Sequence, residues 1–146
     1  MLKKQYLWVL AFSLIAILFA GSPVYADEIR GIGELCLDVK GGGGKGTPVI
    51  VWPCNGRSNQ DWELEGRMLK TEDGLCLDVK GAGGQGNPVI VWTCHGRSNQ
   101  QWALRKDGTI RSADGGLCLD VRGGKAVKGT EVIVWPCTGR ANQKWE

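Results

Sequence analysis

The chain repeats Cys36-Leu37-Asp38-Val39 twice more, as Cys76-Leu77-Asp78-Val79 and Cys118-Leu119-Asp120-Val121. Two further blocks follow each copy in the same order. The first is Val51-Trp52-Pro53-Cys54, which returns as Val91-Trp92-Thr93-Cys94 and Val134-Trp135-Pro136-Cys137. The second is Asn59-Gln60-Asp61-Trp62, which returns as Asn99-Gln100-Gln101-Trp102 and Asn142-Gln143-Lys144-Trp145. The copies start 40 residues apart (Cys36 to Cys76) and 42 residues apart (Cys76 to Cys118). Such a period is typical of one supersecondary unit stacked on its own copies, so a site built within one unit is expected three times.

The N-terminal segment, residues 1–26, has the pattern of a secretory signal peptide. Lys3 and Lys4 precede an apolar run from Tyr6 to Ala20, and a small-x-small cleavage site ends at Ala26. The run is short for a membrane span, which needs about 20 apolar residues. We therefore expect a secreted protein, extracellular or periplasmic, with no stable membrane insertion after cleavage. Its single domain is expected at residues 27–146.

Charge argues against a nucleic-acid partner. The chain has 18 Lys and Arg against 15 Asp and Glu, and no basic block stands out. The clustered positive charge of a nucleic-acid-binding protein is therefore missing. No amphipathic helix for a membrane surface is evident either.

All six cysteines lie in the expected domain, two in each repeat, which in an exported protein indicates disulfides. The pairs lie either within repeats or between neighbouring repeats. Side chains alternate along a strand, so Cys36 shares a face with Asp38, and Cys54 shares a face with Trp52. A hairpin of these two strands brings the sulfurs together, which favours pairing within repeats: Cys36–Cys54, Cys76–Cys94 and Cys118–Cys137. Because the chain has no C-x-x-C motif and a single His, neither a metal nor a cofactor is expected.

Each unit is expected to consist of strands and turns. β-Branched runs such as residues 48–52 alternate with glycine-rich loops at 41–46, 81–86 and 123–129. A last strand is expected at 68–70 and at 109–111. The third copy lacks one after Trp145, but Ile29 precedes Cys36 by the same spacing that separates Leu69 from Cys76. We therefore expect twelve strands in units of about 33–72, 73–114, and 115–146 plus 28–31, with the N-terminal strand closing the ring.

Across residues 28–146 the sequence resembles the ricin-B-type β-trefoil lectins, a family marked by Gln-x-Trp repeats. The motif occurs three times, each time with its cysteine pair. The resemblance implies an all-β fold, the β-trefoil, with three homologous repeats and pseudo-threefold symmetry.

Sugar binding needs an aromatic face for the C–H groups of the ring, together with polar groups for the hydroxyls. By strand alternation Asp38 and Trp52 face the same way, while Leu37, Val39, Val49 and Val51 face the core. The resemblance implies that the Asp accepts hydrogen bonds from two hydroxyls and that the Trp before the second Cys stacks on the sugar. It also implies that the Asn contacts a hydroxyl and that the Gln holds the Asp. The candidate carbohydrate-binding residues are Asp38, Trp52, Asn59 and Gln60; Asp78, Trp92, Asn99 and Gln100; and Asp120, Trp135, Asn142 and Gln143.

Structural roles compete with these assignments. An Asp at a strand end often stabilises a turn, and a purely structural role is the alternative for the three Gln residues. The tryptophans that end the Gln-x-Trp motif, Trp62, Trp102 and Trp145, are the core candidates. Ile50, Ile90 and Ile133 stand where many family sites have a polar residue, which leaves the sugar open. Arg57, Arg97 and Arg140 are interpreted as solvated turn residues, and His95, which has no counterpart in the other copies, as a surface residue.

The sequence therefore predicts a monomeric, multivalent lectin with one shallow site in each repeat. The resemblance favours galactose or N-acetylgalactosamine, with polymers containing xylose or arabinose as the second choice. No enzyme activity is expected, because glycoside hydrolysis usually needs two carboxylates and each repeat offers one recurrent Asp. The alternative is a β-trefoil that binds protein as an inhibitor or effector, since a fold by itself does not fix function.

Overall fold

Three repeats surround a pseudo-threefold axis in the computed structural model, which describes residues 26–146. Repeat 1 contains β2 (Leu35–Val39), β3 (Val49–Pro53), β4 (Asp61–Glu65) and β5 (Met68–Lys70). Repeat 2 contains β6 (Leu75–Val79), β7 (Val89–Thr93), β8 (Trp102–Leu104) and β9 (Ile110–Ser112). Repeat 3 contains β10 (Cys118–Val121) and β11 (Val132–Trp135), and β1 (Asp27–Glu28) lies at the start of the described chain. The predicted all-β trefoil is confirmed.

The helical elements of the described chain are short 3-10 turns. One turn follows the first strand of each repeat: η2 (Lys40–Gly42), η4 (Lys80–Ala82) and η6 (Arg122–Gly124). Another precedes the repeat's second Trp: η3 (Ser58–Gln60), η5 (Ser98–Gln100) and η7 (Ala141–Gln143). The remaining turn, η1 (Ile32–Glu34), precedes β2. The turns η3, η5 and η7 contain the Asn and Gln of the repeated motif and place them beside the first strand of the same repeat.

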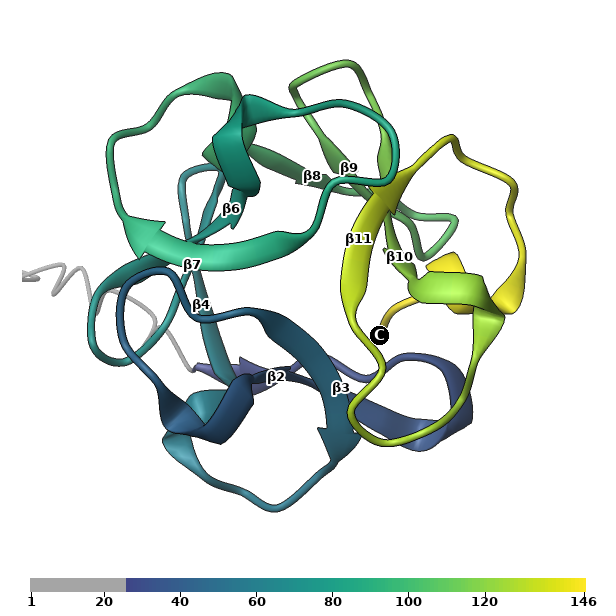
Figure 1. The fold of residues 1–146 in the computed structure, drawn as a ribbon, viewed down its shortest axis with the longest axis horizontal. Helices are drawn as coiled ribbons and strands as arrows, with labels where there is room; N and C mark the ends of the chain where they lie inside the picture. The colour runs from purple at the N-terminus through teal and green to yellow at the C-terminus, as the bar shows by residue number, and fades with distance from the viewer. Residues whose placement is uncertain (1–25) are drawn as a thin grey trace, which may run out of the picture.

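The centre of the molecule is formed by β3, β7 and β11 (Figure 1). Single antiparallel bridges join these strands in a cycle, pairing Pro48 with Ile90, Pro88 with Ile133, and Ile50 with Glu131. Each of these strands also pairs with the preceding strand of its own repeat, as β3 does with β2. Every repeat therefore contacts both others, and the environment of one repeat includes residues of its neighbours.

The core follows from the alternation of side chains along the strands. Leu37, Val39, Val49 and Val51 are at most 2% exposed and pack together with their counterparts in the other repeats. Trp62, Trp102 and Trp145 are also buried, at 3%, 1% and 7% exposed. Their indole N–H groups donate to the backbone carbonyls of Leu37, Leu77 and Leu119 at 2.9, 2.9 and 3.0 Å. Each core Trp thereby fixes the strand that carries the recurrent Asp, and its buried indole N–H is satisfied.

The N-terminal segment closes the third repeat as predicted. Arg30 bridges Cys36, as Lys70 bridges Cys76 and Arg111 bridges Cys118. Arg30 also exchanges two backbone hydrogen bonds with Glu146, of 2.8 and 2.9 Å. The described residues form eleven named strands rather than the twelve expected, because the counterpart of β4 in repeat 3 is reduced to the pairing of Glu146 with Arg30. β9 also lies one residue later than the expected 109–111.

The three disulfides join Cys36 to Cys54, Cys76 to Cys94, and Cys118 to Cys137. Pairing within repeats is therefore confirmed. Cys36 lies opposite Trp52 in the β2–β3 register. Trp52 precedes Cys54, the disulfide partner of Cys36, by two residues. In the chain-entropy account, closing a loop of this length contributes about 3 kcal/mol. Each bond pins the first strand of a repeat to the end of its second strand, next to the recurrent Trp.

The expected signal peptide falls on residues 1–26, and residues 1–25 lie outside the part of the chain that the structure describes. Among residues 26–146, no helix has the length and apolar character needed to cross a membrane.

Candidate functional site

Asp38 forms the floor of the candidate site in repeat 1. It lies on β2 opposite Ile50 of β3 and is 3% exposed. Its Oδ2 accepts hydrogen bonds from Gln60 Nε2 at 2.8 Å and from Asn59 Nδ2 at 3.0 Å. Within residues 26–146 no side chain donates a hydrogen bond to Oδ1 of Asp38. Every buried side-chain oxygen in this range has a hydrogen-bond partner, so an oxygen without one is not buried. Oδ1 is therefore open to solvent and free to accept a hydrogen bond from a ligand.

Gln60 lies behind Asp38 and is fully buried. Its Nε2 also donates to the backbone carbonyl of Pro53 at 3.0 Å, and its Oε1 accepts from the backbone N–H of Asn55 at 2.8 Å. One amide side chain thus joins Asp38 to the end of β3 and to the following turn. Gln60 is a positioning residue, because it fixes the carboxylate without facing the open side of the site.

Trp52 lies on β3 and is 38% exposed, although its neighbour Val51 is fully buried. Strand alternation explains the contrast, since Val51 points into the core and Trp52 points away from it. Trp92 and Trp135 are exposed to the same extent, at 38% and 39%. The burial expected for the two tryptophans of each repeat is therefore what the structure shows, and the exposed set presents an indole face beside each Asp.

These side chains line a cleft of about 880 Å³ in repeat 1. Asp38, Trp52 and Asn59 line it together with Ile50, and Gln60 does not. Its walls are completed by loops on both sides: Lys40 to Gly43, Asn55, Arg57 and Ser58, Thr71 and Asp73, and Gly129. The cleft therefore combines an aromatic face, a carboxylate oxygen and an amide on one open surface.

Repeats 2 and 3 reproduce the hydrogen bonds around the recurrent Asp. Gln100 Nε2 donates to Asp78 Oδ2, and Gln143 Nε2 donates to Asp120 Oδ2, both at 2.8 Å. Asn99 and Asn142 donate to the carbonyls of Val79 and Val121 at 3.3 and 3.2 Å. Asn59 makes the same bond to Val39, at 3.2 Å, in addition to its bond to Asp38. All twelve candidate residues thus occupy equivalent places, four in each repeat.

The three carboxyls share an electrostatic environment. Burial raises the pKa of Asp38 above its ordinary value of 3.8, and the hydrogen bond from Gln60 opposes that shift. Burial likewise raises the pKa of Asp78 and of Asp120, against hydrogen bonds from Gln100 and Gln143. Desolvation disfavours the charged form, whereas a donated hydrogen bond favours it. Each of these carboxyls therefore protonates more readily than an exposed Asp.

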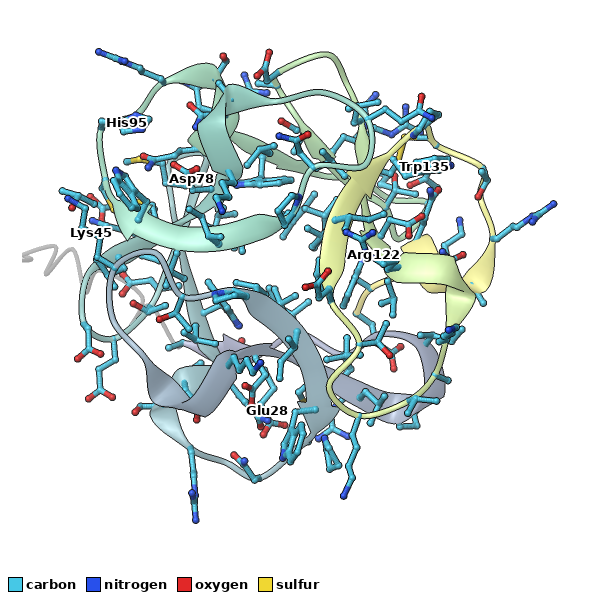
Figure 2. The ribbon with its side chains drawn as sticks, viewed as in Figure 1. Glu28, Lys45, Asp78, His95, Arg122 and Trp135 are labelled. Carbon is cyan, nitrogen blue, oxygen red and sulfur yellow. A yellow bond between two sulfur atoms is a disulfide. The ribbon has the colours of Figure 1, made fainter. Side chains whose placement is uncertain are left out.

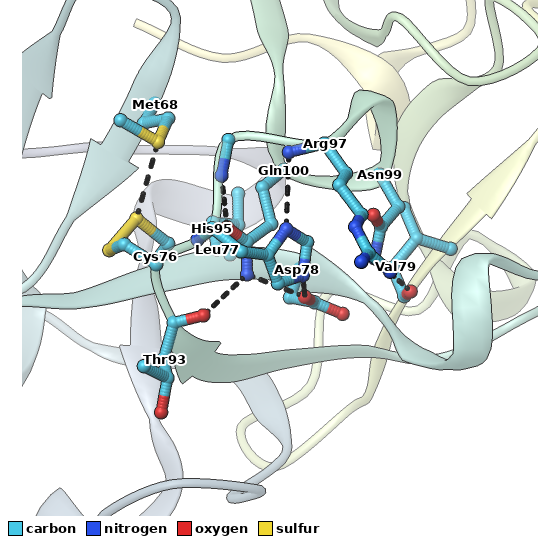
Figure 3. Close-up of polar contacts among 12 residues, drawn as sticks. Met68, Cys76, Leu77, Asp78, Val79, Thr93, His95, Arg97, Asn99 and Gln100 are labelled. Atoms are coloured by element: carbon cyan, nitrogen blue, oxygen red, sulfur yellow. Dashed lines mark hydrogen bonds and ion pairs between the residues drawn. A yellow bond between two sulfur atoms is a disulfide. The ribbon is translucent and has the colours of Figure 1, made fainter.

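His95 is an exposed residue, as the sequence predicted, and its ring lies beside the recurrent Asp of repeat 2. Figure 3 shows the imidazole above Asp78, with Nε2 3.6 Å from Asp78 Oδ2. Its Nδ1 accepts the backbone N–H of Arg97 at 3.1 Å, which places the proton of the neutral ring on Nε2, toward the carboxylate. Asn55 and Thr138 occupy this position in the other repeats. The residue after the second Cys therefore distinguishes the three sites, a difference that comparing the repeats could have revealed.

One cluster among residues 26–146 has the composition of a metal site: Glu28, Cys36 and Cys54, whose ligand atoms lie within 4.8 Å of one another. Both sulfurs are joined in a disulfide. A disulfide sulfur is not the thiolate that binds a metal, so this cluster is not a metal centre.

The sequence matches the ricin-type β-trefoil lectin domain family over residues 26–145. The chain belongs to this family. Members of this lectin family are typically non-enzymatic. Membership of the family supports carbohydrate binding as the general function of the chain. No curated protein matches the chain in a direct sequence comparison.

Solved structures agree with this assignment. ThreeFoil, a designed protein with threefold symmetry, is 30% identical, with 84% of this chain and 95% of ThreeFoil covered at a TM-score of 0.75. The agglutinin from Abrus precatorius is 28% identical, with 86% and 49% covered at a TM-score of 0.76. A non-toxic homologue of type II RIPs from Momordica charantia, in complex with α-methyl-D-galactoside, is 26% identical, with 84% and 46% covered at a TM-score of 0.75. The chain thus spans about half the length of the two plant proteins.

Proposed function

We propose that the protein is a secreted, monomeric lectin without catalytic activity, which binds glycans through three shallow sites. The observation that carries this proposal is the recurrence of one constellation in every repeat: an exposed Trp, an Asn and a buried Asp held by a Gln. In repeat 1 the free Oδ1 of Asp38 and the indole of Trp52 line the same cleft. These groups supply the acceptor and the apolar face that a sugar ring needs.

Galactose or N-acetylgalactosamine is the proposed sugar type, and xylose- or arabinose-containing polysaccharide is the second choice. The Momordica charantia relative in complex with α-methyl-D-galactoside supports the first. Ile50, Ile90 and Ile133 support a site that is apolar beside the Trp, since each is at most 6% exposed on the same face of the sheet as the Asp. A glycan array with residues 27–146 ranks these sugars directly.

The threefold recurrence of the constellation supports multivalent binding. Linking weak sites raises avidity by about 10²–10⁴ without any new contact. We therefore expect weak binding of a monosaccharide at each site and strong binding to a polymer or surface that displays many copies.

The test removes the stacking faces. The variant Trp52→Ala/Trp92→Ala/Trp135→Ala is expected to stay folded and to bind no glycan, whereas Trp52→Ala alone reduces the calorimetric stoichiometry from about three sites to two. Leu64→Ala/Leu104→Ala is the matched control, because these side chains are exposed apolar groups at 43% and 50% and do not line the cleft. Normal glycan binding by the folded triple variant overturns the proposed sites, because the sugar then binds elsewhere on the protein. A wild-type protein that binds no sugar on the glycan array favours the alternative, a trefoil that binds protein.

The same preparation tests the absence of catalysis. Asp73 lines the cleft of repeat 1 together with Asp38, so two carboxylates border it. Hydrolysis of chromogenic glycosides that Asp38→Asn and Asp73→Asn each abolish would show a glycosidase instead.

A further inference from the structure

The glycine-rich loop of each repeat lies against the exposed Trp of the next repeat. The loop of repeat 1 exchanges two backbone hydrogen bonds with Val91, from Gly46 N to Val91 O at 2.7 Å and from Val91 N to Thr47 O at 3.0 Å. Gly86 and Asn87 bond Val134 in the same way, and Gly129 and Thr130 bond Val51. The strand residue bonded in each case directly precedes Trp92, Trp135 or Trp52. Each candidate site therefore has one wall from another repeat.

The contacting glycine in this wall is favoured by its backbone conformation, and it lies in ordinary van der Waals contact with the indole. Gly46, Gly86 and Gly129 have φ values of 88°, 84° and 88°, in the region that other residues rarely adopt. A Cβ on Gly46 would stand 3.5 Å from Trp92 Cζ3, and a Cβ on Gly86 would stand 3.5 Å from Trp135 Cζ3. The residue before the glycine is consequently held beside the neighbouring Trp.

This preceding residue differs between the sites. Lys45 places its Nζ 4.3 Å from the ring centroid of Trp92, and Lys128 places its Nζ 5.4 Å from that of Trp52. The corresponding residue beside Trp135 is Gln85, which carries no charge. In Figure 2 Lys45 lies where the loop of repeat 1 meets β7, at the outer edge of repeat 2.

Both lysines are exposed, and neither forms an ion pair with a carboxylate within 4.0 Å among residues 26–146. Other cations recur in all three sites, Lys40, Lys80 and Arg122 in one position and Arg57, Arg97 and Arg140 in another. Those positions therefore do not separate the sites, whereas the loop residue before the glycine does, as does the residue after the second Cys, which is His95 in repeat 2.

We propose that Lys45 and Lys128 make the sites of repeats 2 and 1 selective for sugars that carry an anionic group, a carboxylate or a sulfate. The site of repeat 3, with Gln85, prefers neutral sugars. This inference rests on the proposed lectin function and names the class of ligand that each site takes. The specificity is set in trans, because the loop of one repeat determines what the next repeat binds.

The sign of the effect follows from the cation–π contact. A neutral sugar that stacks on the face covered by the ammonium displaces the ammonium from the indole. The cation–π contact is then lost, and no ion pair replaces it. An anionic sugar keeps the ammonium as an ion-pair partner whether Lys45 leaves the ring or stays on the opposite face. In both geometries the ratio of acidic to neutral affinity is higher at Trp92 than at Trp135.

The experiment reads each site separately by NMR titration of the tryptophan indole N–H signals in the protein with all three sites intact. The probes are methyl galactoside, methyl galacturonide and methyl galactoside 6-sulfate, which differ at one carbon. The variants are Lys45→Gln and Gln85→Lys, which exchange the residues that the repeats themselves use. Lys106→Gln, in the turn between β8 and β9, removes the same charge away from the cleft residues.

Lys45→Gln is expected to lower the acidic-to-neutral affinity ratio at Trp92 by about two- to fivefold, and Gln85→Lys is expected to raise it at Trp135 by a similar factor, as for an exposed ion pair. Both differences shrink between about 0.05 M and about 1 M salt. A preference for the sulfate alone identifies the anionic group as sulfate and supports the inference. Ratios that stay the same in both variants while the sugars bind overturn the inference and leave the lectin function standing. If no probe shifts any exposed indole signal and a glycan array is also silent, both fail together.

Discussion

Gln60 Nε2 donates a 2.8 Å hydrogen bond to Asp38 Oδ2, and the same amide joins the carboxylate to the end of β3. Gln60 is fully buried, and Asp38 is 3% exposed. A carboxylate so far from solvent would be unfavourable without a donor of this kind. The bond uses Oδ2 and leaves Oδ1 for a ligand, so the Gln of the motif both stabilises the repeat and orients its Asp.

Replacing Gln60 by Leu is therefore expected to cost stability as well as binding. The substitution leaves the Asp38 carboxylate, the Pro53 carbonyl and the Asn55 N–H without their buried partner. We expect a loss of at least about 2 kcal/mol in the free energy of unfolding, since a lost bond to a charged group costs about 1.5–3 kcal/mol. Urea denaturation of the disulfide-bonded protein measures it.

Asn59→Ala is the matched control for this change. Asn59 also donates to Asp38 but is only partly buried. It is expected to weaken sugar binding at repeat 1 while costing less stability than Gln60→Leu. Equal stability losses in the two variants would show that Gln60 has no special structural part.

The two tryptophans of repeat 1 are expected to respond in opposite ways. Trp62→Ala leaves a cavity in the core and removes the bond to the Leu37 carbonyl, and it should cost about 3–5 kcal/mol of unfolding free energy. Trp52→Ala removes a side chain that is 38% exposed and should leave the melting temperature nearly unchanged. Thermal melts of the two variants side by side decide the assignment, which is reversed if Trp52→Ala is the more destabilised.

Features set by strand alternation could be predicted from the sequence. Alternation depends only on neighbouring residues, so it correctly assigned Leu37 and Val51 to the core, Trp52 to the surface and Cys36 to Cys54. The equal spacing of Ile29 and Leu69 from the following Cys also located the strand that closes the ring. The roles of the candidate residues in sugar binding came from resemblance and stay a prediction.

Features set by contacts between distant segments could not be predicted. Lys45 meets Trp92 only because the barrel places the loop of repeat 1 on β7 of repeat 2, and no local pattern encodes that neighbour. His95 reaches Asp78 because a short turn after Cys94 folds back over β6. His95 has no counterpart in the other repeats, and differences of this kind distinguish three otherwise equal sites.

Removing the N-terminal strand is expected to destabilise the whole fold. A chain that starts at Gly31 loses the two backbone bonds between Arg30 and Glu146 and the bond from Leu37 N to the Ile29 carbonyl at 2.8 Å. It also exposes an unpaired sheet edge. Its melting temperature should fall well below that of a chain starting at Asp27.

Arg30→Ala provides the control for the truncation. This variant keeps the backbone bonds and loses only the ion pair between Arg30 and Glu28. The side chains of this pair are 46% and 22% exposed, respectively. Surface pairs of this kind contribute about 0–1 kcal/mol. If the truncated chain melts like Arg30→Ala, the N-terminal strand is not part of the barrel.

Acidification is expected to abolish sugar binding before it unfolds the protein. Burial raises the pKa of Asp38 above 3.8, so this carboxylate protonates at a higher pH than an exposed Asp and stops accepting from the sugar. The sign for stability is opposite. A raised folded-state pKa means that the ionised form penalises the fold, and this penalty is relieved as the pH falls through that pKa. Asp107, whose pKa is lowered to about 2 by hydrogen bonds from Thr109, loses its stabilising contribution only as the pH falls below 3.8.

The measurement follows the Trp52 indole NMR signal on adding sugar, from about pH 7 to about pH 4. Far-ultraviolet circular dichroism reports folding in the same samples. The sugar-induced shift of the indole signal should fade while the fold persists. Binding that survives unchanged until the protein unfolds would remove the Asp38 carboxylate from the site.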